Sequence, residues 1–172
     1  MGLVFRSMMH PSGLINQTLS AMGLDMLMHN WLTDAKIAIF SCAFVEIWKW
    51  TGYTMVIFLA GLQSIDKTYY EAAQLDGATY WQQLRSVTIP LIMPALNNAV
   101  VISVVGGLKV FDIVQSLTNG GPGNATSVFG TLIYSSFSSY GRGCAASMIL
   151  TFFVLLIALP TNRFISRKEV EV

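Results

Sequence analysis

Glu71-Ala-Ala-Gln-Leu-Asp-Gly-Ala-Thr-Tyr-Trp-Gln-Gln-Leu-Arg-Ser-Val-Thr-Ile-Pro90 is the longest polar-rich stretch between apolar segments of this 172-residue chain. Thr68 and Glu71 match a capping box, which predicts a helix that begins at the threonine. Gly77 interrupts this helix and can adopt positive φ, and Pro90 marks the return to apolar sequence. We expect a helix, a glycine elbow and a second short helix, shaped either to dock another protein or to pack as an ordinary amphipathic loop.

The composition is that of a membrane protein. Hydrophobic residues make up 53% of the chain and charged residues only 11%, whereas a soluble domain has about 25% charged residues. The net charge is +1, and no run of Lys or Arg exceeds two, so nucleic acid is not an expected partner. Cys42 and Cys144 lie in apolar stretches and are predicted to be buried. His10 and His29 have no partner motif, so we expect no catalytic residues, no metal site and no enzyme.

The order of apolar and polar segments predicts an all-α fold, a polytopic membrane helical bundle. About three stretches are long enough to cross a hydrocarbon layer, which takes roughly 20 residues. Short interfacial and cytoplasmic helices complete the bundle. The expected parts are an external segment with short helices (1–36), three spans (37–62, 91–117 and 143–162) within the domain 37–172, and a polar loop (63–90).

Lysine and arginine predict the orientation of these spans. The polar loop and the C-terminal tail lie on one side of the membrane and hold Lys67, Arg85, Arg163, Arg167 and Lys168. The loop between the second and third spans holds only Arg142. Because positive residues favour the cytoplasmic side, we expect the polar loop and the C-terminus in the cytoplasm.

Two pairs of opposite charges interrupt the apolar spans. Glu46 and Lys49 are three residues apart, as are Lys109 and Asp112. On a continuous helix this spacing places both members on one face, where they can pair. Each pair either packs the bundle or lines a pathway, since charged groups inside a membrane helix are often functional. Gly106-Gly107, just before the second pair, predicts a kink or a close-packing site.

Several motifs in order resemble one family. Glu71-Ala-Ala-x-x-Asp-Gly-Ala78, followed by Ile89-Pro90 and Pro94, resembles the EAA loop of binding-protein-dependent ABC importer permeases. Phe58-Leu-Ala-Gly-Leu-Gln-Ser-Ile65, Phe111-Asp112 and Leu117-Thr-Asn-Gly-Gly-Pro122 extend the resemblance through nearly the whole chain. The pattern is most similar to the carbohydrate-uptake permeases of that family.

The resemblance implies a transport subunit that works with several partners. These are two cytoplasmic ATP-binding subunits, a second permease subunit, an extracytoplasmic solute-binding protein, a carbohydrate substrate and the lipid bilayer. The chain itself needs no cofactor, because ATP is bound by the ATPase partners.

The loop 63–90, the coupling loop from here on, would fit a groove on the ATPase. Glu71 would make the polar contact, while Ala72 and Ala73 would allow close approach. The coupling residues carried over are Glu71, Ala72, Ala73, Asp76, Gly77, Ala78 and Pro90. The residues carried over to the substrate path are Gly106, Lys109, Val110, Phe111, Asp112 and Gln115.

The chain departs from the family pattern in two ways. Asp66 stands where the family often has proline, and aspartate can instead cap the start of a helix. The chain also matches only the last three of about six expected spans, as in an N-terminally truncated permease. The alternative function is a truncated, non-transporting membrane protein that binds or sequesters the ATPase or the partner permease.

Overall fold

A computed structural model describes residues 1–137 and 139–166, and within them every regular element is helical. Arg167 and Lys168, which the orientation argument uses, lie outside the described residues. The all-α class is confirmed. The elements are α1 (Gly2–Met8), α2 (Leu14–Ala21), η1 (Asp25–Leu27), α3 (Ala38–Gln63), α4 (Lys67–Leu75), α5 (Tyr80–Gln83), the π-helical η2 (Leu84–Thr88), α6 (Ile89–Leu91), α7 (Met93–Leu108), α8 (Asp112–Leu117), α9 (Phe129–Ser135) and α10 (Tyr140–Ser166).

The chain forms two compact units, of which the first comprises residues 1–49 and 107–152. Its core is small, and α1 packs against α8 within it. Cys42 is buried there, as predicted, but the prediction for Cys144 is wrong because that thiol is exposed. The apolar side chains near Cys144 on α10, such as Met148, also face outward rather than into a core. The core residues are Met9, Cys42, Val45, Ile113, Val114 and Leu117.

The short helices predicted for residues 1–36 are present, and one buried amide joins parts of this segment. Asn16 is 4% exposed. Its Nδ2 donates to the backbone oxygens of Pro11 at 3.0 Å and His29 at 3.1 Å, and its Oδ1 accepts from Trp31 Nε1 at 2.9 Å. Ser41 Oγ on α3 then donates to the Trp31 carbonyl at 2.7 Å. These bonds satisfy polar groups that would be costly to bury alone.

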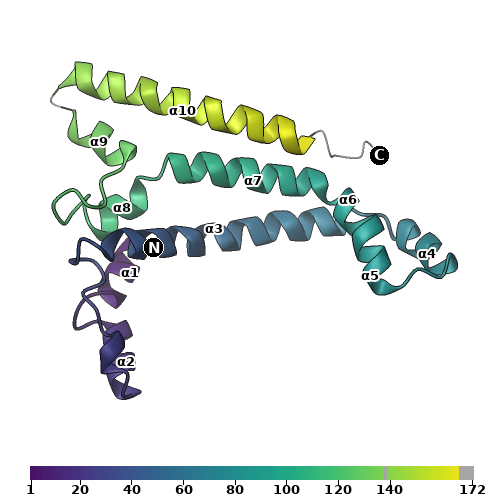
Figure 1. The fold of residues 1–172 in the computed structure, drawn as a ribbon, viewed down its shortest axis with the longest axis horizontal. Coiled ribbons are helices and arrows are strands. Elements are labelled where there is room, and N and C mark those ends of the chain that lie inside the picture. The colour runs from purple at the N-terminus through teal and green to yellow at the C-terminus, as the bar shows by residue number, and fades with distance from the viewer. Residues whose placement is uncertain (138, 167–172) are drawn as a thin grey trace. The chain divides into compact units, whose positions relative to one another are not determined.

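The second unit comprises residues 50–106 and continues from 153. In it, the second half of α3 lies antiparallel to α7 (Figure 1). The helices touch closely at two glycines: a Cβ on Gly61 would lie 2.5 Å from Ala95 Cβ of α7, and one on Gly106 would meet the Trp50 ring of α3. Farther along, Asn97 Nδ2 of α7 donates to Asn162 Oδ1 of α10 at 3.0 Å. Small residues and interhelical amide bonds are typical of helix packing inside membranes.

The described α3 lies over the range predicted for the first span, and α10 includes the range predicted for the third and extends beyond it at both ends, whereas the second range differs. The described α7 ends at Leu108 instead of continuing to residue 117, and α8 begins separately at Asp112. By length and composition, α10 could cross a membrane alone, and Tyr80–Leu91 with Met93–Leu108, bent by 60°, could form a second span. Pro94 explains this bend, because its nitrogen cannot donate to the preceding turn. That α3 also crosses the membrane stays a prediction.

Candidate functional site

The first helix of the coupling loop begins at an aspartate cap. Asp66 Oδ1 accepts the backbone N–H of Thr68 and its hydroxyl, both at 2.9 Å. The expected N-cap at Thr68 is therefore wrong by two residues, while the capping role considered for Asp66 is confirmed. These bonds stabilise the ionised carboxylate, so the backbone N–H of Thr68, followed by its hydroxyl, lowers the pKa of Asp66.

The elbow after α4 depends on a glycine, as predicted. Gly77 has φ +74°, a left-handed conformation that residues with a Cβ seldom adopt. The N–H of Gly77 donates to the Gln74 carbonyl at 3.0 Å, and the N–H of Ala78 to the Ala73 carbonyl at 2.9 Å. These bonds close the last turn of α4 and direct the chain into α5.

The second half of the loop is fixed by side-chain bonds. Thr79 N donates to Gln82 Oε1 at 2.8 Å, which caps α5. Gln83 Nε2 donates to the Ala78 carbonyl at 2.9 Å. The π-helical η2 follows, and the Tyr70 hydroxyl on α4 bonds the Thr88 hydroxyl at 3.0 Å. This last bond joins both ends of the loop across 18 residues.

The elbow borders an open cavity of about 450 Å³ that is lined by both polar and apolar groups. In Figure 1, α4 and α5 project beyond the neighbouring ends of α3 and α7, so this cavity lies on the projecting part of its unit. Four of its lining residues were predicted through the resemblance: Ala73, Asp76, Gly77 and Ala78. The four others, Gln82, Gln83, Ser86 and Val87, were missed because only the fold brings them to the elbow.

The predicted coupling residues divide between this cavity and its surroundings. Glu71 and Ala72 are exposed on α4 and do not line the cavity. Pro90 is half-buried within α6. Tyr80 and Trp81 on α5 are 72% and 75% exposed. The coupling loop therefore presents two distinct features, an exposed small-residue helix and a hollow beside it.

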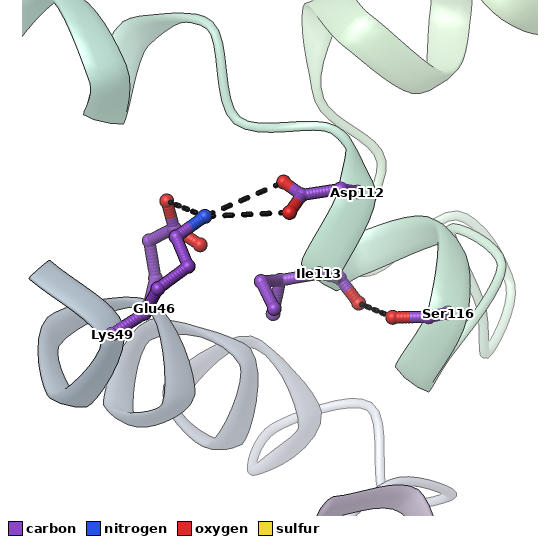
Figure 2. Close-up of polar contacts among 5 residues, drawn as sticks. All are labelled: Glu46, Lys49, Asp112, Ile113 and Ser116. Atoms are coloured by element: carbon purple, nitrogen blue, oxygen red, sulfur yellow. Dashed lines mark hydrogen bonds and ion pairs between the residues drawn. The ribbon is translucent and has the colours of Figure 1, made fainter. Parts of the chain in front are cut away.

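A second polar cluster lies in the first unit (Figure 2). Lys49 Nζ pairs with Glu46 Oε1 at 2.9 Å, which confirms the predicted pair. The same nitrogen lies 3.4 Å from Asp112 Oδ2. The expected pair of Lys109 with Asp112 is wrong, because residues 109–111 interrupt the helix and the spacing rule no longer applies.

The surroundings of this cluster are mostly apolar. Ile113, next to Asp112, is 2% exposed, and its carbonyl accepts from Ser116 Oγ at 3.1 Å, which holds the first turn of α8 (Figure 2). Glu46 and Val110 line a cavity of about 230 Å³ whose other lining residues are apolar or glycine. A lysine between two carboxylates thus fastens α3 to the start of α8.

The residues predicted for a substrate path are distributed over several elements. Lys109, Val110 and Phe111 form the break between α7 and α8, while Asp112 and Gln115 lie on α8. The Phe111 ring lies 5.3 Å from that of Tyr134, and Gln115 donates to Asn119. Gly106 belongs to the other unit and packs on Trp50. Contact of these residues with a substrate stays a prediction.

Comparison with known proteins identifies the family. Residues 2–167 match the family described as binding-protein-dependent transport system inner membrane component. The chain belongs to this family. The permease chain is 40% identical over 158 residues to the trehalose/maltose transport system permease protein MalF of Thermococcus litoralis, covering 88% of this chain and 52% of that protein. It is 35% identical over 160 residues to the lactose transport system permease protein LacF of Rhizobium radiobacter, covering 91% and 54%.

A solved structure shares the fold of this permease chain. It is a bacterial ABC transporter involved in the import of the acidic polysaccharide alginate, with a TM-score of 0.79 and 30% sequence identity. The match covers 96% of this chain and 59% of that one. The permease chain spans about half the length of the two curated relatives. The recognition made from the EAA-type loop is confirmed, as is the membrane helical fold.

No group of three or more potential metal ligands occurs within residues 1–137 and 139–166. Asp66, Gln82 and Gln83 in the loop are used for capping and hydrogen bonding, and Glu46, Lys49 and Asp112 form ion pairs. The family is one of membrane transport components.

Proposed function

We propose that this chain is the transmembrane permease part of an ATP-driven importer and that the coupling loop transmits movement from the ATPase subunits. The observation that carries the proposal is the rigid construction of the loop. It is capped at Asp66, turned at Gly77 and fastened by the bond between Tyr70 and Thr88. A loop that transmits a displacement must not deform under it, and these bonds join α4 through α6 to the bent span.

The proposed substrate is a sugar or related carbohydrate. The names of the two relatives specify trehalose, maltose and lactose, and the related structure is an alginate importer. Phe111 and Tyr134 supply aromatic faces beside polar groups on α8, a combination that binds sugar rings. The path residues proposed here are Gly106, Lys109, Val110, Phe111, Asp112 and Gln115.

The proposed partners are two ATP-binding subunits, a second permease subunit and an extracytoplasmic solute-binding protein. The coupling loop and the C-terminus face the cytoplasm in this proposal, as the distribution of lysine and arginine favours. ATP binds to the ATPase partners, and the permease chain carries no cofactor. ATP-driven closure of the ATPase pair moves the coupling loop and rocks the helices joined to it, which alternates access to the path.

A substitution at Gly77 tests the coupling role. A Cβ at this position would meet no atom of the chain within 4 Å, so the Cβ adds no clash within the chain, and Gly77→Val strains the backbone at a positive φ, which costs roughly 1–2 kcal/mol or more for a β-branched residue. We expect Gly77→Val to retain ATP hydrolysis and lose most substrate uptake, measured in membranes that contain the permease with its partner subunits.

Gly52→Val provides the matched control for this experiment. A Cβ on Gly52 also meets no atom within 4 Å, and its φ is not positive. Uptake per ATP hydrolysed should therefore stay unchanged in that variant. Equal uptake by the Gly77→Val and wild-type transporters would refute the coupling role of the elbow.

A further inference from the structure

The stretch that follows α2 in the external segment exposes several large apolar side chains. Residues 21–30 are all exposed, and among them Met22 is 73% and Met26 94% exposed. Single exposed apolar residues are normal on a protein surface, but a group within seven positions marks a surface that meets another apolar phase. The members of this group, the methionine patch from here on, are Met22, Leu24, Met26, Leu27 and Met28.

The chain around the methionine patch carries almost no charge. Asp25 is the only acidic or basic residue in the stretch 11–33. Residues 14–30 also contain no arginine, tryptophan, tyrosine or phenylalanine, although arginine, tryptophan and tyrosine anchor most protein interfaces. An apolar surface with neither anchors nor basic residues suits a neutral lipid surface better than a protein partner or an anionic headgroup.

The direction of α2 suits the plane of a membrane. In Figure 1, α2 runs across the direction of α3, and the chain after α2 leads to the N-terminal end of α3. In the proposed function α3 crosses the bilayer, so a helix that runs across its direction lies along the membrane surface. Amphipathic helices bind lipid in this orientation.

Hydrogen bonds fix the level of the patch relative to α3. Asn16 of α2 bonds Trp31 Nε1 at 2.9 Å and the His29 carbonyl at 3.1 Å. The Trp31 carbonyl accepts from Ser41 Oγ, in the first turn of α3, at 2.7 Å. Tryptophan favours the boundary between membrane and water. The patch lies in the chain between Asn16 and Trp31, so these bonds hold it near the same boundary.

We infer that the methionine patch inserts into the headgroup region of the outer leaflet and sets the depth of the first turn of α3. This inference rests on the transmembrane role of α3 in the proposed function. Burial of apolar surface drives the insertion, and the flexible, unbranched methionine side chains adapt to irregular space among lipids. The external segment then resists movement of α3 along the membrane normal.

A spin label at residue 26 tests the inference in the permease complex, reconstituted in phosphatidylcholine nanodiscs. Met26→Cys is made in a Cys144→Ser background, because Cys144 is exposed whereas Cys42 is buried. The experiment measures collisions of the label with oxygen, which concentrates in lipid, and with a water-soluble nickel complex. We expect the ratio of oxygen to nickel collisions to be several times higher at residue 26 than for Ala125→Cys, an exposed position in the polar loop between α8 and α9.

A label at Met22→Cys should give the same high ratio as the label at residue 26. Two other results overturn the inference. A ratio at residues 22 and 26 equal to that at residue 125 places the patch in water. Few collisions with either reagent place the patch under a protein surface, such as that of the second permease subunit or the solute-binding protein.

A label at Met55→Cys separates the inference from its basis. Met55 is 63% exposed in the second half of α3. If this label collides mainly with the nickel complex, α3 does not cross the bilayer, and the transmembrane arrangement of the proposed function fails. A label in lipid at residue 55 together with labels in water at residues 22 and 26 overturns the inference alone.

Discussion

Gly106 and Gly107 are adjacent on the same helix turn, yet the structure predicts opposite responses to alanine. A Cβ on Gly106 would lie 2.8 Å from Trp50 Cε2 and 2.9 Å from Cη2, well inside the 3.5–4.0 Å at which carbon atoms attract. A Cβ on Gly107 would meet no atom within 4 Å. The two substitutions add the same methyl group, so the difference between the unfolding free energies of the two variants reports the packing against Trp50.

The expected magnitude follows from two effects. Replacing glycine by alanine favours a helix by about 1 kcal/mol at either position. Inserting a methyl group into a filled contact costs about 1–3 kcal/mol. Gly107→Ala should therefore be stabilising by up to about 1 kcal/mol, and Gly106→Ala should be less stable than Gly107→Ala by about 1–3 kcal/mol.

The assay is reversible denaturation of the permease in lipid nanodiscs, followed by the fluorescence of its tryptophans. A third variant combines Gly106→Ala with Trp50→Leu. It should be more stable than the Trp50→Leu variant, because the smaller side chain at residue 50 makes room for the added methyl group. Equal stability of Gly106→Ala and Gly107→Ala would refute the close packing of α3 on α7 at this point.

Two further predictions concern polar groups. Lys49→Met removes the cation beside Glu46, whose side chain is only 13% exposed, and should lower the free energy of unfolding by about 3 kcal/mol. Asp112→Asn changes a carboxylate that is 69% exposed and should lower the free energy of unfolding by less than about 1 kcal/mol. A larger loss of stability from Asp112→Asn than from Lys49→Met would contradict this prediction. The pKa of Asp66 is lowered in the folded loop, so its cap stabilises α4 above the unfolded pKa and is lost as the pH falls through the lower folded pKa. The protection of the α4 amides against hydrogen exchange, measured relative to the unfolded chain at the same pH, should fall over that acidic range in the wild type. The Asp66→Asn variant should show no such step.

The local features of the coupling loop could be predicted from the sequence. Gly77 marked the elbow because few other residues adopt its backbone conformation, and Glu71-Ala-Ala-x-x-Asp-Gly-Ala78 with the motifs around it pointed to the family. The N-cap was placed two residues late because Asp66 and Thr68 are both good caps, and the choice depends on which backbone N–H groups remain unpaired. The hydrogen bond between Tyr70 and Thr88 could not be predicted, because neither residue type specifies a partner 18 positions away.

The cluster of Glu46, Lys49 and Asp112 shows where the rule of three-residue spacing predicts an ion pair correctly and where it fails. Glu46 and Lys49 lie on one continuous helix, and their pairing follows from three-residue spacing. Lys109 and Asp112 have the same spacing, but Lys109 lies in the break before α8, and Asp112 pairs instead with Lys49, 63 residues earlier. Only the glycines at 106 and 107 indicated a break, because Lys109 and Asp112 at three-residue spacing are also compatible with a continuous helix. Asn16 was missed likewise, since its three partners come together only on folding.

The π-helical turn Leu84–Thr88 sets the rotation of the coupling loop about the axis of the bent span that follows it. An α-helix advances about 100° per residue, so a turn that contains one additional residue rotates everything beyond it by about that angle. Deleting a single residue here would give a more regular helix and would swing α4 and the elbow around the axis of the span. The number of residues in this stretch is therefore a stricter requirement than their identity: an exchanged side chain alters one contact, whereas a lost residue reorients the whole loop.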